Sequence, residues 1–148
     1  MIFAYDPATN PLNNTEWAFP LCECFHIASF AFSIGTIALV DLRMFGWGLD
    51  RRSAAQLLRD TEIWTLIGLV VVITSGLAIF SSDPVLYMHN ASFKLKMIGL
   101  LFAIAYNYTI HRWTVLGNPS PGRAAVVASV SLGLWFSLVL AGVFIAFI

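Results

Sequence analysis

The stretch AAVVASVSLGLWFSLVLAGVFIAFI, residues 124–148, contains no charged side chain. A helix of this length exceeds the roughly 20 residues that cross the hydrocarbon core of a bilayer, so the stretch predicts a transmembrane helix. Small residues recur in it at every fourth position, which is typical of a ridge that packs closely against another membrane helix. This small-residue ridge consists of Ala125, Ser129, Gly133, Ser137 and Ala141.

Three more apolar runs precede it, at residues 17–42, 63–80 and 93–110. Of the 148 residues, 59% are hydrophobic and 11% are charged, and the mean hydropathy is +0.80. A soluble domain of this size could not bury so much apolar surface. We therefore predict one all-α integral membrane domain over residues 1–148, a bundle of four transmembrane helices with the lipid bilayer around it.

The distribution of basic residues predicts how the bundle is oriented. The arginines follow the first and third apolar runs: they are Arg43, Arg51, Arg52, Arg59, Arg112 and Arg123. Lysine and arginine beside membrane helices mark the cytoplasmic side. The N-terminal tail and the loop 81–92 carry neither residue, which predicts that both termini and this loop lie on the outer, periplasmic side.

The first basic residue is Arg43, so the positively charged start of a cleavable signal peptide is missing. We expect the first helix to remain part of a multi-pass protein of the bacterial inner membrane. The formal net charge is zero, which argues against a nucleic-acid partner.

Titratable side chains inside membrane spans are costly, so each one is a candidate for function. Glu23 and His26 lie in the first run, and Lys94 and Lys96 lie at the start of the third. The two lysines are on the predicted outer side, which the arginines avoid, so we expect an anionic group beside them. Glu23, a cofactor carboxylate and a lipid headgroup are the alternatives.

The three histidines differ in predicted depth. His26 and His89 share the outer side, whereas His111 lies at the inner end of the third run, where it can meet Asp41 or Arg43. Haem b is held by axial imidazoles, and its propionates need cationic or hydrogen-bonding partners. We therefore predict one haem b with His26 and His89 as its axial ligands.

Other residues complete the predicted haem site. Lys94 and Lys96 would meet the propionates, and Gly76 in the second run would let the porphyrin lie close, although glycine serves helix packing equally well. Glu23 precedes His26 by about one helical turn. We expect it either to accept the second ring N–H of His26 or to pair with Lys96.

A polar stripe on the first run supports an alternative site. Cysteine, histidine and hydroxyl side chains recur there at the three- and four-residue spacing of one helix face, which should look into the bundle. Cys22 and His26 on this face, with Met88 and His89 on the same side of the membrane, form a ligand set that suits copper. The stripe consists of Cys22, His26, Ser29, Ser33 and Thr36.

Two segments, WAFPLCECFHIASFAFSIGTIALVDLRMFG and HNASFKLKMIGLLFAIAYNYTIHR, carry a family resemblance. With their E-x-x-H, D-L-R and H-N-x-x-F-x-x-K patterns, they resemble small four-helix bacterial inner-membrane proteins of poorly characterised function. The layout is similar to that of CopD-like and small b-type cytochrome membrane subunits. The resemblance implies haem or copper association, and it implies roles for Glu23, His26, Asp41, Arg43, His89, Asn90 and Lys96.

The expected function is electron transfer, as a subunit or partner of a larger redox complex or of a periplasmic electron-transfer protein. We find no nucleophile with its base, no phosphate loop and no paired carboxylates, so enzyme activity by the chain alone is not expected. Two alternatives remain open: a structural accessory subunit that binds lipid or pigment, and a copper-binding or copper-transport protein.

Overall fold

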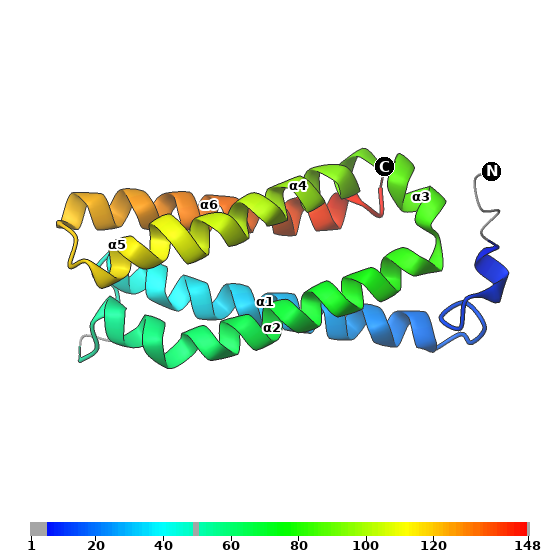
Figure 1. The fold of residues 1–148 in the computed structure, drawn as a ribbon, viewed down its shortest axis with the longest axis horizontal. Coiled ribbons are helices and arrows are strands. Elements are labelled where there is room, and N and C mark those ends of the chain that lie inside the picture. Colours follow the sequence, from blue (N-terminus) through cyan, green and yellow to red (C-terminus); the bar gives the residue numbers. More distant parts are fainter. Residues whose placement is uncertain (1–5, 49–50, 148) are drawn as a thin grey trace.

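The computed structural model describes residues 6–48 and 51–147, which are all-helical with no strand (Figure 1). Two layers of helices lie side by side. The first holds α1 and α2, and the second holds α4, η2 and α5 together with α6; the short α3 joins the layers at one end. The elements are η1 (Pro7–Thr9), α1 (Ala18–Met44), α2 (Ala54–Ser82), α3 (Pro84–His89), α4 (Ala91–Tyr106), η2 (Asn107–His111), α5 (Arg112–Leu116) and α6 (Pro121–Phe144).

Local sequence signals explain where the helices begin. Ser53 and Gln56 form a capping box at the start of α2, in which each side chain bonds the other's backbone N–H. Asp83 caps α3, and Asn90 caps α4 by accepting from the Phe93 N–H at 2.9 Å. Gly46, with φ of +83°, makes the left-handed turn that follows α1.

The predicted spans agree with the helices in part. Three helices, α1, α2 and α6, are long and apolar enough to cross a membrane, which indicates a membrane protein. They correspond to the predicted runs 17–42, 63–80 and 124–148, although α2 starts nine residues earlier, at its capping box, and Ile148 lies outside the described residues. The fourth predicted run, 93–110, coincides with no single helix, because the structure divides this part of the chain among α4, η2 and α5.

The element η2 is a π-helical turn inside an otherwise continuous helix. The backbone stays right-handed helical on both sides of it, at Tyr106 and Arg112. A π turn bonds residue i to i+5 and so widens the helix locally, which is often associated with function. Here Asn107 and His111, at the two ends of the turn, are both buried.

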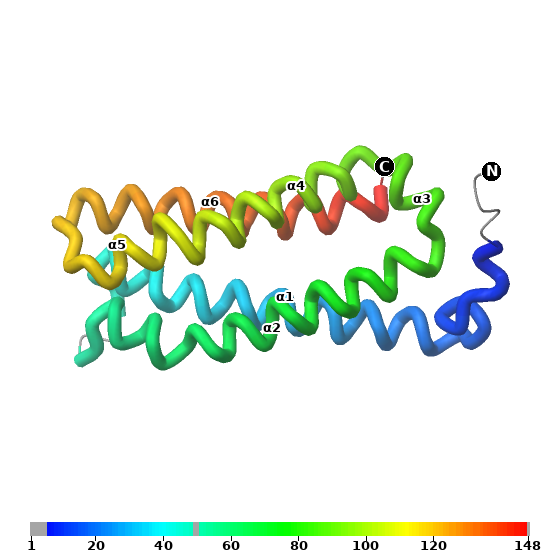
Figure 2. Tube along the Cα trace, viewed as in Figure 1, coloured from blue at the N-terminus to red at the C-terminus, as the bar shows by residue number. Residues whose placement is uncertain are grey.

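The hydrophobic core is concentrated away from α3. We call the end of the bundle around the α1–α2 and α5–α6 turns the arginine-rich end, and the opposite end the α3 end. No residue of α1 before Phe30 is buried, and Ser82 is the one buried residue of α2 after Val72. Figure 2 shows α1 diverging from the α4–α6 layer toward the α3 end. The few buried residues of α1 and α2 there show that the packing is loose.

Large apolar side chains cover the outside of the bundle. Leu101 is 70% exposed, Phe102 67% and Val126 64%, as lipid-facing residues should be. The predicted small-residue ridge does not pack within the chain as expected. Ala141 is buried and Ala125 is partly buried, whereas Ser129, Gly133 and Ser137 are exposed. The reason is that α6 turns a neighbouring face toward the core, with Ala128, Ser131, Trp135 and Leu138.

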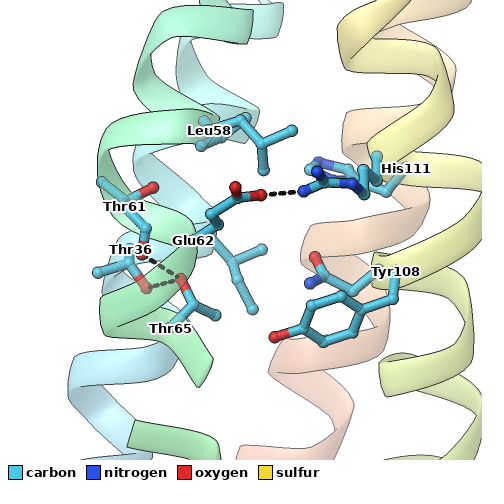
Figure 3. Close-up of a pocket in the computed structure, with 11 residues that line it drawn as sticks. Thr36, Leu58, Thr61, Glu62, Thr65, Tyr108 and His111 are labelled. Atoms are coloured by element: carbon cyan, nitrogen blue, oxygen red, sulfur yellow. Dashed lines mark hydrogen bonds and ion pairs between the residues drawn. The ribbon is translucent and has the colours of Figure 1, made fainter. Parts of the chain in front are cut away.

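The polar stripe of α1 does face the bundle, where it forms the seam with α2. The hydroxyls of Thr36 and Thr65 are 2.7 Å apart and buried (Figure 3). Ser33 packs against Gly68, where an added Cβ would come within 2.2 Å of the serine Oγ. The seam therefore depends on glycine at the point where α2 meets Ser33.

We expect Gly68→Leu to destabilise the protein by about 1–3 kcal/mol, since the new side chain would overpack the seam. Gly133→Leu is the matched control, because an added Cβ there would meet nothing within 4 Å. Thermal unfolding in detergent, followed by circular dichroism, measures the difference. Equal unfolding midpoints for the two variants would contradict the role of Gly68.

Candidate functional site

His26 lies at the α1–α2 seam in the loosely packed half. Its Nδ1 is 2.9 Å from the Ser75 hydroxyl oxygen. That hydroxyl donates its own hydrogen to the Val71 carbonyl at 2.6 Å, so it must accept from His26. Nδ1 therefore carries the ring hydrogen, and Nε2 keeps a free lone pair.

Cys22 and His26 converge on the same residue of α2. The Cys22 thiol, one helical turn before His26 on α1, donates to the Ser75 carbonyl at 3.9 Å, whereas His26 contacts the Ser75 hydroxyl. Gly76 lies against the His26 ring, where an added Cβ would come within 3.1 Å of the ring. The missing side chain at Gly76 thus makes room for the histidine itself.

Lys96 approaches this site from α4. Its Nζ lies 5.4 Å from the centre of the Phe30 ring, within the range of a cation–π contact. Gly142 on α6 leaves room for it, since a Cβ there would come within 3.1 Å of Nζ. Lys94 is exposed. In the described part of the chain, neither lysine forms an ion pair with Glu23.

His89 is the last residue of α3 and is exposed. Its Nδ1 is 2.8 Å from the Val85 carbonyl oxygen. A carbonyl can only accept, so Nδ1 donates and Nε2 again keeps its lone pair. The structure does not bring His89 into hydrogen-bond contact with His26, and within residues 6–48 and 51–147 no group of three or more His, Cys, Asp or Glu side chains gathers as a metal site.

The residues around His89 fix how α3 is attached. Asn90 donates from Nδ2 to the Ile145 carbonyl at 3.0 Å, which ties the start of α4 to the end of α6. Tyr87 packs against the rings of Phe80 and Phe93. Burial, together with the nearby Glu23 carboxylate, raises the pKa of Tyr87 above its usual value near 10. Glu23 itself is exposed.

A second polar cluster lies deep in the arginine-rich half, and it is the most buried in the described structure. Asp41 on α1 and His111 on η2 are 0% and 1% exposed, with His111 Nε2 2.6 Å from Asp41 Oδ1. The Ser131 hydroxyl on α6 donates to Asp41 Oδ2 at 2.7 Å. The carboxylate thus joins three elements from both layers.

Beside this cluster is an ion pair between Glu62 of α2 and Arg112 of α5, both partly exposed (Figure 3). The expected meeting of His111 with Asp41 is confirmed, whereas Arg43 instead donates to the backbone carbonyls of Arg52 and Gly48 and closes the α1–α2 turn. The sequence reasoning did not single out Ser131 or Glu62. Glu62 directly precedes the predicted run 63–80, and its charge at that boundary was the available signal.

Comparison with known protein families identifies the family of this chain. The family of unknown function DUF6644 matches residues 18–148. The chain belongs to this family. No curated protein and no solved structure matches it. The DUF6644 region begins with the first residue of α1 and contains both polar clusters, while η1 lies outside it.

We expect Ser131→Ala to destabilise this DUF6644 protein by about 1–3 kcal/mol, because Asp41 Oδ2 would lose its donor at full burial. Ser129→Ala is the control: it removes a similar hydroxyl two residues away on α6, but an exposed one bonded to its own helix. Thermal unfolding in detergent compares them. If Ser131→Ala is no less stable than Ser129→Ala, the Asp41 cluster does not hold the layers together.

Proposed function

We propose that this DUF6644 protein is a bacterial inner-membrane protein that holds one haem b and transfers electrons, as a subunit or partner of a redox complex on the outer side. His26 of α1 and His89 of α3 would be the axial ligands. The haem would supply one-electron exchange, and the protein would orient the imidazoles and control burial.

One observation carries this proposal: in both His26 and His89, Nδ1 is hydrogen-bonded within the protein and Nε2 is the nitrogen left to bind a metal. In both rings Nδ1–H is engaged by an oxygen of the protein, Ser75 Oγ in one case and the Val85 carbonyl in the other. Metal-binding histidines typically donate their second ring N–H in this way, which fixes the ring and raises the basicity of the free nitrogen. His111 has the opposite arrangement, since its Nε2 faces Asp41.

The surroundings of His26 also suit a bound group. The half of the bundle near α3 has few buried side chains, so a planar cofactor there would displace little packing. Lys96, partly buried beside Phe30, and Lys94, exposed on the same helix, would pair with the propionates. Gly76 would act indirectly, by allowing the His26 ring to lie against α2.

We expect the protein purified from haem-supplied cells to show a Soret band that sharpens on dithionite reduction. His26→Ala and His89→Ala should each abolish the six-coordinate low-spin spectrum, because each removes an axial nitrogen. His111→Gln is the control and should leave the spectrum unchanged. Absence of haem, or a spectrum lost in His111→Gln but kept in His89→Ala, would refute the assignment.

Copper binding is the second candidate, because Cys22 and His26 converge on Ser75. Metal analysis of the same preparations separates the two: Cys22→Ser should remove copper but leave a haem spectrum intact. A folded protein with neither metal would favour the structural accessory subunit that binds lipid or pigment.

The orientation is part of the same proposal. We infer that α4, η2 and α5 together make the fourth span, and that the arginine-rich end faces the cytoplasm. Both the described N-terminal segment and the end of α6 lie at the α3 end (Figure 1), where Asn10 and Asn13 bond the end of α2. The haem site would then be near the outer surface.

Cysteine labelling in intact cells tests this orientation. In a background with Cys22 and Cys24 changed to serine, we expect Val85→Cys to react with a membrane-impermeant maleimide. Trp47→Cys should react after the cells are opened. Both positions are exposed in the structure, so their reactivity reports the side of the membrane. The reverse pattern would place the site at the cytoplasmic face.

A further inference from the structure

A small cavity lies between the two layers, beside the Asp41–His111 pair. Its volume of about 10 Å³ is room for about one water molecule. Its lining includes Glu62, Asn107, Tyr108, His111 and Arg112 (Figure 3). It is independent of the proposed haem site, which lies toward the other end of the bundle.

Three residues that line this cavity carry a buried polar atom without a hydrogen-bond partner among the described residues. The atoms are the Asn107 carbonyl oxygen Oδ1, the Tyr108 hydroxyl and His111 Nδ1. Unpaired buried polar atoms are rare and costly, and a shared water is the usual remedy. Figure 3 shows the Tyr108 ring extending from its helix toward α2, across the space that the cavity occupies.

The state of His111 follows from its partners. Asp41 accepts from the Ser131 hydroxyl at Oδ2, which leaves Oδ1 to accept from His111 Nε2. His111 therefore carries hydrogen on Nε2, and in the neutral ring Nδ1 is a buried lone pair. One water can satisfy all three groups: it donates its two hydrogens to His111 Nδ1 and Asn107 Oδ1, and it accepts the hydrogen of the Tyr108 hydroxyl.

Glu62 connects the cavity to the arginine-rich end. Its side chain lines the cavity, pairs with Arg112 and is 36% exposed, so it reaches both the cavity and the surroundings. On the other side the way is closed by tightly packed apolar residues. That hydrophobic cluster contains Phe30, Ile37, Leu69, Val72, Ala103, Trp135 and Leu138.

We propose that a water bound in this cavity passes protons between Glu62 and Nδ1 of His111, so that the Asp41–His111 pair is a buried proton-binding site open to the arginine-rich end. The Glu62 carboxylate first takes a proton from water at the arginine-rich end; it then gives this proton to the bound water, which gives another to Nδ1. An imidazolium then pairs with the Asp41 carboxylate, and Glu62 returns to its ion pair with Arg112. No electrons are exchanged, and the apolar cluster makes this a site that binds protons without conducting them across the bundle.

Titratable and charged groups from every element packed around His111 set its environment. They are Asp41 of α1, Glu62 of α2, Tyr106 of α4, Tyr108 of η2 itself and Arg112 of α5; α6 contributes the neutral Ser131. The Tyr106 hydroxyl is engaged by the Val127 carbonyl at 3.0 Å. The imidazole therefore has two carboxyl groups and one guanidinium group around it.

Nuclear magnetic resonance of the protein labelled with ¹⁵N-histidine tests this site, with the His111 signals assigned by their loss in His111→Gln. We expect these signals to report exchange of the His111 ring hydrogens with bulk water. Glu62→Gln should slow proton exchange between His111 and bulk water by roughly a hundredfold, the lower end of what a positioned proton donor contributes. Asp60→Asn is the control, because Asp60 is an exposed carboxylate on the same helix, paired with Arg52.

A second variant tests the water itself. Asn107→Leu removes one water partner and fills part of the cavity, so it should also slow the exchange while Asp41 and Glu62 remain in place. If this variant does not fold, Glu62→Gln decides alone. A His111 whose exchange rate is the same in Glu62→Gln and Asp60→Asn overturns the proposal.

Discussion

A carboxylate with no access to solvent organises the bundle. Asp41 is fully buried in a protein surrounded by apolar surface, where an ionised group is tolerated when both oxygens are satisfied. The two donors come from the opposite layer, His111 from η2 and Ser131 from α6. The pairing therefore sets the register between α1 and the second layer. The π turn places both of its end residues, Asn107 and His111, inside the bundle.

The same constraint explains the α1–α2 seam. Hydroxyls and a histidine that would find no partner in lipid are turned toward α2, which meets them with Thr65, Gly68, Ser75 and Gly76. The packing around the polar groups of the seam differs between its two ends. Near Asp41 its polar groups are sealed by tight packing, whereas near His26 the ring stays within a thinly packed region and keeps one nitrogen free.

Sequence reasoning reached the helical membrane bundle because charge-free apolar runs of this length are rare outside membrane spans. It also located the polar face of α1, since the three- and four-residue spacing survives in the structure from Cys22 to Thr36. It missed the π turn, because a continuous apolar run gives no sign of a local change in hydrogen bonding. The ridge of small residues on α6 packs within the chain only in part, since Ala141 is buried while the middle of the ridge lies beside the buried row of Ala128 and Ser131.

The sequence predicted some residues of the candidate sites and not others. His26 and the contact of His111 with Asp41 follow from titratable residues being rare in such runs. Ser131 could not be selected in the same way, because a serine in a membrane helix commonly bonds its own backbone, as Ser129 and Ser137 do here. For His26 and His111, the nitrogen that bonds the protein depends on a partner from another helix, so the sequence could not predict it; His89 bonds the Val85 carbonyl of its own helix.

The uneven core has a consequence for how this protein can change over generations. Most of the packing that keeps the helices together lies between Phe30 and the arginine-rich end, and the region around His26, Lys96 and α3 contributes little of it. A substitution near α3 therefore removes less buried packing than one in the arginine-rich half. The residues that keep the helices together and the residues around His26 are thus largely separate sets, so a change in one set leaves most contacts of the other in place.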